Sequence, residues 1–117
     1  MSPSVPPRAA YIHVPFCARK CGYCNFTVLA QRDDLIESYL QAVERELSLA
    51  GEPQEVDTLY FGGGTPSHLA PHQLARLLKI TQQWYPVADR YELTVEANPN
   101  DLDAPRADVL ARHGVNR

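Results

Sequence analysis

Strand-like and helix-like segments alternate along the chain, and this alternation limits the fold more than any other feature. The strand-like runs are rich in β-branched and aromatic residues, and each is closed by proline, glycine or an Asn-Pro pair. These runs cover residues 11–14, 56–61 and 91–97. Apolar residues at helical spacing follow each run, over residues 35–47, 71–84 and 105–113. The repeated order of strand and helix predicts an α/β fold with a parallel sheet and helical crossovers.

The ends of the helical segments carry suitable residues. Asp33 or Asp34 is expected to cap the first helix, and Gly51 stands where a helix commonly ends in a left-handed residue. Gly114 does the same for the third helix, and residues 115–117 follow it where a fourth strand should begin.

The predicted units are too few to close a barrel. Barrels of alternating strands and helices need roughly 200 residues or more. We therefore expect residues 1–10 to be a flexible leader, and residues 11–117 to be the N-terminal part, about three βα units, of a partial (β/α) barrel truncated before its fourth strand. Such a piece would leave apolar surface uncovered, so it is expected to fold poorly alone and to be inactive by itself.

The composition excludes several classes of protein. The chain has 117 residues, of which 44% are hydrophobic, and a net charge of −3. These values fit a packed domain and give no reason to expect nucleic acid as a partner. No run of about 18 apolar residues is present, so neither a transmembrane helix nor membrane contact is expected. Residues 1–10 lack the apolar core of a secretory signal, and the expected location is the cytoplasm.

Three cysteines lie close together, in the spacing Cys17-x3-Cys21-x2-Cys24. An odd number at such tight spacing is unsuited to a disulfide framework and favours thiolate ligands of a metal in a reducing compartment. Iron–sulfur clusters and zinc both suit thiolates. A cluster held by three cysteines keeps one iron open for a ligand, as a catalytic centre requires. A zinc site completed by His13 and a set of unligated thiols are the alternatives.

Two more features stand at the ends of predicted strands. Residues 62–64 are all glycine, and the missing Cβ atoms would let the backbone approach a ligand. A purely conformational turn is the alternative. Glu96 ends the third strand, on the face opposite Leu93 and Val95 if the side chains alternate. A carboxylate on an inward face needs a partner, whereas an exposed glutamate at a strand end needs none.

The cysteine spacing after a first strand resembles the signature of the radical S-adenosylmethionine superfamily. The run YIHVPFCARKCGYCNF at residues 11–26 is similar to the branch that contains oxygen-independent coproporphyrinogen III oxidase and the heme chaperone HemW. The likeness continues, in order, through YFGGGTPS at 60–67, EANP at 96–99 and GVNR at 114–117. Together these motifs span nearly all of the chain after the leader.

The resemblance implies a [4Fe–4S] cluster and S-adenosylmethionine as cofactors. Cys17, Cys21 and Cys24 match the three cluster ligands, while the cofactor's amino and carboxylate groups would bind the fourth iron. The cluster would then cleave the cofactor reductively. The fold implied is the corresponding radical S-adenosylmethionine barrel, with its active site at the carboxyl ends of the strands.

Further matches imply contacts to S-adenosylmethionine itself. Gly63, Gly64 and Thr65 would contact the methionine part, including its ammonium group, and Glu96 would contact the ribose hydroxyls or the ammonium. Two tyrosines also match positions near the cofactor, although an aromatic core suits both. They are Tyr11 and Tyr23, of which Tyr23 is expected to pack against the adenine. His13 matches without a clear role, and the remaining histidines are expected to be solvated, namely His68, His72 and His113.

Phe26 divides the two activities of this branch. The pattern typical of the oxidases is Cys-x3-Cys-x2-Cys-x-Cys, which has a further cysteine at the position that Phe26 occupies here. The sequence is therefore closer to the heme chaperone, whose implied role is to bind heme as cargo and deliver it to acceptor proteins. The alternatives are an oxidase that decarboxylates the propionates of coproporphyrinogen in heme biosynthesis, and a zinc-binding structural module. Whether the chain is part of an enzyme stays open at this point.

Overall fold

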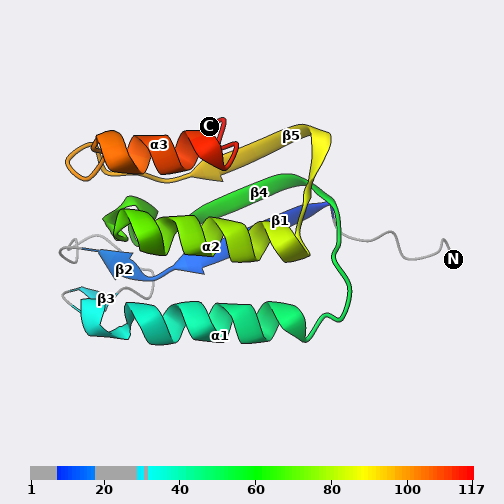
Figure 1. Cartoon of the computed structure of the whole chain (residues 1–117), viewed down its shortest axis with the longest axis horizontal. Coiled ribbons are helices and arrows are strands. Elements are labelled where there is room, and N and C mark those ends of the chain that lie inside the picture. The colour runs from blue at the N-terminus through cyan, green and yellow to red at the C-terminus, as the bar shows by residue number, and fades with distance from the viewer. Residues whose placement is uncertain (1–7, 18–28, 31) are drawn as a thin grey trace, which may run out of the picture.

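The computed structural model describes residues 8–17, 29–30 and 32–117. Three parallel strands form the main sheet, and three α-helices accompany them (Figure 1). The strands of this sheet are β1 (Ala9–Val14), β4 (Val56–Gly63) and β5 (Val87–Val95). The α-helices are α1 (Ile36–Ser48), α2 (Pro71–Trp84) and α3 (Ala104–Arg112). The short elements are β2 (Phe16–Cys17), β3 (Leu29–Ala30), η1 (Asp33–Leu35) and η2 (Pro66–His68).

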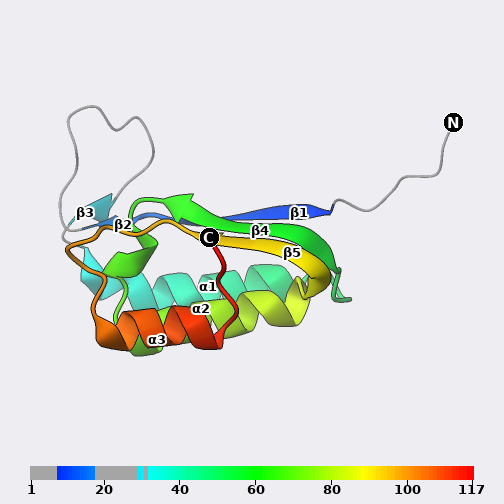
Figure 2. The same cartoon turned by 90° about the horizontal axis from the view of Figure 1, so that it is seen from above.

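The sheet has the strand order β1-β4-β5, and both neighbouring pairs are parallel. All three helices lie against the same face of this sheet, and the opposite face carries none of them (Figure 2). The prediction of an α/β fold built from about three βα units is therefore confirmed. It is the arrangement of part of a barrel, with the helices outside and the open face turned toward the barrel axis.

Alternation along the strands produces the core. Leu59 and Phe61 of β4, and Leu93 and Val95 of β5, are buried against the helical layer. Their neighbours in sequence lie on the open face, as expected for successive residues of a strand. The sequence of α2 predicts a buried stripe at 74, 77, 78, 81 and 84. The first four are buried at this helical spacing, while Trp84 is only partly buried.

The predicted helices agree with the structure to within one residue at each end, and α2 agrees at both ends. The third strand was predicted at 91–97, but β5 begins four residues earlier and ends two residues earlier. The cap predicted for the first helix is wrong. A 3-10 turn, η1, precedes α1, and Leu35 stands at the N-cap of α1 without a side-chain hydrogen bond. The two aspartates bind other side chains, because Asp33 accepts from His68 and Asp34 accepts from Arg32. Gly51 does adopt a left-handed φ of +80°.

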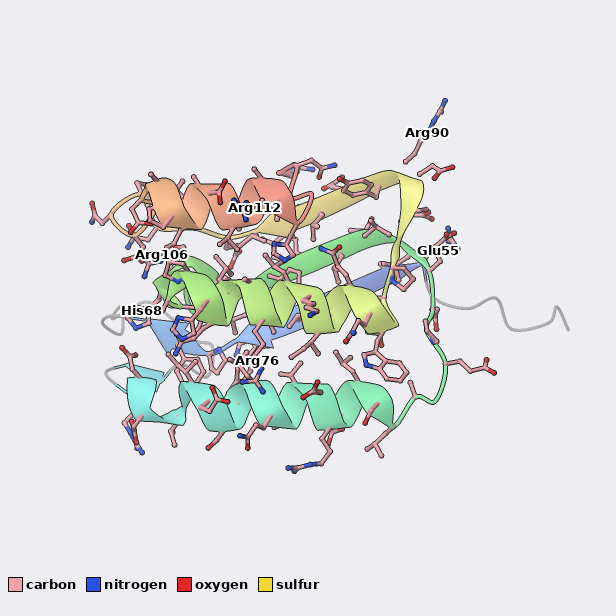
Figure 3. All side chains as sticks on the ribbon, in the orientation of Figure 1. Glu55, His68, Arg76, Arg90, Arg106 and Arg112 are labelled. Carbon is pink, nitrogen blue, oxygen red and sulfur yellow. The ribbon has the colours of Figure 1, made fainter. Side chains whose placement is uncertain are left out.

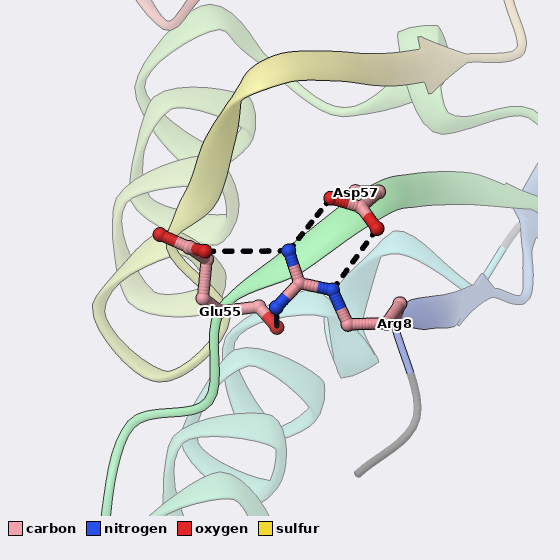
Figure 4. Close-up of polar contacts among 3 residues, drawn as sticks. All are labelled: Arg8, Glu55 and Asp57. Atoms are coloured by element: carbon pink, nitrogen blue, oxygen red, sulfur yellow. Dashed lines mark hydrogen bonds and ion pairs between the residues drawn. The ribbon is translucent and has the colours of Figure 1, made fainter. Parts of the chain in front are cut away.

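Ion pairs fasten the elements at the surface. Arg8, just before β1, donates to both carboxylate oxygens of Asp57 in β4 and also reaches Glu55 (Figure 4). On the helical layer, Arg76 of α2, labelled in Figure 3, pairs with Glu37 of α1. These contacts hold β1 in register with β4 and α1 beside α2.

The last residues lie along the outer edge of β5. The Asn116 side chain accepts from the N–H of Leu93 at 2.8 Å and donates to the carbonyl of Tyr91 at 3.0 Å. The N–H of Val95 donates to the carbonyl of Arg117 at 3.2 Å. Residues 116–117 thus begin to pair with β5 where a fourth strand was predicted. Among the described helices, none has the length and apolar character needed to cross a membrane.

Candidate cofactor site at the carboxyl ends of the strands

The carboxyl ends of β1, β4 and β5 meet at one edge of the sheet, because all three strands are parallel. Val14 at the end of β1 is in register with Gly63 at the end of β4, and Phe61 is in register with Val95 at the end of β5. The start of the cysteine loop, the glycine turn and Glu96 are therefore brought to one place. Their proximity follows from the parallel order of the three strands.

The first residues of the cysteine loop are fixed to the glycine turn by two backbone hydrogen bonds. Gly64 N–H donates to the carbonyl of Val14, and Thr65 N–H donates to the carbonyl of Phe16, both at 2.7 Å. Cys17 follows Phe16 in β2 and is in register with Ala30 of β3. The predicted ligands Cys21 and Cys24, and the predicted adenine contact Tyr23, lie outside the described residues.

Two glycines of the turn have no space for a side chain. A Cβ on Gly64 would lie 2.6 Å from the carbonyl oxygen of Phe16 and 2.9 Å from that of Val14. A Cβ on Gly63 would lie 2.4 Å from Nδ1 of His13, and Gly63 also has a φ of +113°. Glycine is required at 64 because the turn packs directly against the backbone of the first strand and loop, and at 63 because of the positive φ and the His13 ring.

Glu96 lies over the end of β4 on the open face. Its Oε2 accepts a 2.6 Å hydrogen bond from the Tyr60 hydroxyl, and its Oε1 accepts a 3.1 Å hydrogen bond from the N–H of Gly63. Gly62 makes this approach possible, because a Cβ there would lie 2.7 Å from Oε1. Alternation places Glu96 opposite the buried Leu93 and Val95, as the sequence predicted.

An aromatic surface adjoins this carboxylate. Tyr11 of β1 stacks on Tyr60 of β4, with ring centroids 5.7 Å apart, and Tyr11 is 55% exposed. The hydrogen bond to Glu96 is the main cause that raises the pKa of Tyr60, and burial and the negative charge of Glu96 add to it. Burial, followed by the charge of Glu96, raises the pKa of Tyr11. Both rings therefore stay neutral over the physiological range.

The hydrogen-bonding groups still available at this edge of the sheet suit a ligand that donates hydrogen bonds. The N–H groups of Gly63, Gly64 and Thr65 all donate within the protein. A ligand at this edge would instead meet acceptors, since carbonyl and carboxylate oxygens each keep a second lone pair. An ammonium group and ribose hydroxyls are donors of this kind. The residues present therefore fit the ammonium group and the ribose hydroxyls of S-adenosylmethionine, whereas its carboxylate is itself an acceptor and needs other partners.

Sequence reasoning missed three residues that hold the site together. Tyr60 was not singled out, although its place two residues before Gly62 puts it on the open face. Ser67 is fully buried, and its Oγ accepts from the N–H of Asn98 at 2.9 Å, which joins the two motifs that follow β4 and β5. His68 was expected to be solvated, and this is wrong. Its side chain is 17% exposed and its Nε2 lies 2.7 Å from Oδ1 of Asp33.

Comparison with known proteins assigns the family. The model of the Radical SAM superfamily matches residues 11–117, and the chain belongs to that superfamily. The heme chaperone HemW of Bacillus subtilis is 39% identical over 115 residues, which cover 94% of this chain and 30% of that protein. The oxygen-independent coproporphyrinogen III oxidase of Bradyrhizobium diazoefficiens is 38% identical over 112 residues, covering 92% and 25%.

A solved structure agrees in fold. Coproporphyrinogen III oxidase (HemN) from Escherichia coli, described as a radical SAM enzyme, superimposes with a TM-score of 0.82 at 29% identity. The match covers 97% of this chain and 27% of that one. The fold is therefore the N-terminal part of a radical SAM barrel. The chain spans about 30% of the length of the chaperone and about a quarter of the oxidases.

Proposed function

We propose that residues 11–117 form the cluster- and cofactor-binding part of a radical SAM protein of heme metabolism, of the HemW heme chaperone type. Cys17, Cys21 and Cys24 would bind three irons of a [4Fe–4S] cluster. The cofactor S-adenosylmethionine would lie against the carboxyl ends of the strands. Heme would be the cargo, and heme-acceptor proteins would be its partners.

One observation carries the first part of this proposal. The stem of the cysteine loop is hydrogen-bonded to the glycine turn through Phe16 and Thr65, and Glu96 reaches the same turn through Gly63. A metal bound by this loop would therefore lie beside the carboxylate and the carbonyl oxygens that suit a donor-rich ligand. A purely structural zinc site would not require a carboxylate and free carbonyl oxygens beside the metal.

The chain's own residues would bind and orient the cofactor. Carbonyl oxygens of residues 63–65 and the Thr65 hydroxyl would accept hydrogen bonds from its ammonium group. Glu96 would accept from the ribose hydroxyls or the ammonium, and Tyr11 would give it an apolar face. When bound, the cluster and cofactor supply one-electron reductive cleavage of a sulfonium bond.

Phe26 favours the chaperone over the oxidase, because the cysteine pattern of the oxidases has a further cysteine at this position. The first relative named above, a heme chaperone, supports the same choice. The oxidase is the second candidate, because an oxidase is nearly as similar in sequence and another is similar in structure.

The experiment that separates them uses the protein expressed from its source gene, reconstituted anaerobically with iron and sulfide. We expect it to bind heme in a spectroscopic titration and to leave coproporphyrinogen III unchanged in the presence of S-adenosylmethionine and a reductant. Turnover of coproporphyrinogen would overturn the chaperone and establish the oxidase. A Phe26→Cys variant is expected to gain no oxidase activity, which controls for the motif alone.

A further inference from the structure

We propose that Tyr60 is a positioning residue that holds the Glu96 carboxylate in the orientation needed to bind S-adenosylmethionine. This inference rests on the function proposed above, in which Glu96 contacts the cofactor. It assigns to a side chain of β4 a role at the end of β5. Tyr60 itself would not touch the reacting atoms.

The geometry fixes both oxygens of one carboxylate. Tyr60 donates to Oε2 at 2.6 Å, while the N–H of Gly63 donates to Oε1 at 3.1 Å. Two donors on opposite oxygens define the plane of the group as well as its position. The remaining lone pairs of the two oxygens are left for a ligand. Without the hydroxyl, one hydrogen bond would remain and the carboxylate could rotate about it.

The Tyr60 ring is itself held in place. It stacks on Tyr11 with an interplanar angle of 20°. A Cβ at Gly62 would lie 2.7 Å from Cε1 of the ring. The hydroxyl therefore reaches Glu96 from a ring that stacks on a neighbouring strand and for which a glycine makes room.

The charges around the hydroxyl keep it a donor. Glu96 at the end of β5 and Tyr11 on β1 both raise the pKa of Tyr60, while Arg117 lowers it by a smaller amount. The neutral tyrosine is the form that donates to an ionised carboxylate. Hydrogen bonds to a charged partner are among the stronger ones in proteins, so removal of this one should be measurable.

A double-mutant cycle tests the role. The protein expressed from its source gene is reconstituted anaerobically, and the Kd for S-adenosylmethionine is measured by equilibrium dialysis. The forms compared are wild type, Tyr60→Phe, Glu96→Gln and the double variant. We expect Tyr60→Phe to weaken binding about tenfold. In the Glu96→Gln background the same change should alter the Kd by no more than about twofold, because the group to be positioned has lost its charge.

A matched control and a second readout exclude a merely structural effect. Tyr91→Phe removes a comparable hydroxyl from β5, one that donates a 2.7 Å hydrogen bond to the carbonyl of Gly114 and does not contact Glu96. This variant should leave the Kd unchanged. Nuclear magnetic resonance of ¹³Cζ-labelled tyrosine, without cofactor, should show a Tyr60 pKa above its ordinary value. That pKa should fall toward the ordinary value in Glu96→Gln.

The outcomes separate this inference from the proposed function. If Glu96→Gln weakens binding and Tyr60→Phe leaves the Kd unchanged, the positioning role is overturned and the proposed function stands. Equal weakening by Tyr60→Phe in both backgrounds also overturns it. If the wild-type protein fails to bind S-adenosylmethionine, the proposed function falls and the positioning role falls with it.

Discussion

The backbone N–H of Thr65 donates a 2.7 Å hydrogen bond to the carbonyl oxygen of Phe16. This bond continues the pairing of β1 with β4 past the end of both strands. It fixes the residue before Cys17 to the turn that is predicted to bind the cofactor. The cysteine loop and the glycine turn therefore form one structural unit, although about 40 residues of sequence separate them.

Gly64→Ala should disrupt this unit. The added Cβ would lie within 3 Å of three backbone atoms, of Val14, Pro15 and Phe16, which cannot move without separating the loop from the turn. We expect a loss of about 1–3 kcal/mol in the free energy of unfolding, and reduced iron content after reconstitution.

Gly51→Ala is the control for that variant. Gly51 has a φ of +80° with open space around it, so alanine there costs about 1–2 kcal/mol of backbone strain. Iron content should stay at the wild-type value. Full iron loading in Gly64→Ala, with unchanged stability, would contradict the close packing of turn and loop.

Ser67→Ala should destabilise the protein by about 1–3 kcal/mol. Ser67 is fully buried, and its hydroxyl is the partner of the N–H of Asn98, which would lose its acceptor. Ser38→Ala, on the exposed side of α1, should change stability by no more than about 0.5 kcal/mol. Urea unfolding monitored by circular dichroism compares the two, and equal effects would argue against the Ser67 bridge.

Tyr39 should make stability fall at alkaline pH. Its hydroxyl donates to the carbonyl of His13 at 2.6 Å, and burial raises its pKa well above the ordinary 10.0. Because the folded state favours the neutral form, its contribution is complete below pH 10 and is lost as the pH rises beyond that. Tyr11 and Tyr60 add dependence of the same sign.

Tyr39→Phe provides the check. It should lower the free energy of unfolding at pH 8 by about 1–3 kcal/mol, since the carbonyl of His13 loses a donor. The decline above pH 10 should then be shallower than in wild type. Urea titrations between pH 8 and pH 11 measure both effects, and identical slopes in the two proteins would exclude Tyr39 as a source.

Residues 1–117 expressed alone are predicted to fold poorly. One face of the sheet carries none of the helices (Figure 2) and presents Tyr11 at 55% exposure, and Leu49 and Leu102 are exposed as well. We expect strong binding of a hydrophobic dye and a broad thermal transition. A sharp, cooperative melt of this chain would contradict the expectation.

Most of the fold could be predicted from the sequence, because its signals are local. The helical period of α2 and the proline in its first turn fix both ends of that helix. Strand alternation correctly separated Leu93 and Val95 from Glu96. These features depend on residues close together in the chain, and the parallel topology then brings the strand ends together without further information.

Two of the errors concern side chains whose partners are distant in sequence. Asp33 was expected to cap a helix, yet it pairs with His68, 35 residues away. Tyr60 was missed for the same reason, since its importance lies in a hydrogen bond to Glu96, 36 residues later. Single-residue patterns contain no signal for such pairs.

The central claim is that the three cysteines bind a [4Fe–4S] cluster whose open iron accepts S-adenosylmethionine. The most direct test is electron paramagnetic resonance of the anaerobically reconstituted, reduced protein, with and without S-adenosylmethionine. We predict about four irons per protein, a signal of a reduced cluster that changes when the cofactor is added, and loss of that signal in Cys17→Ala. A colourless protein that binds one zinc and gives no such signal would contradict the account.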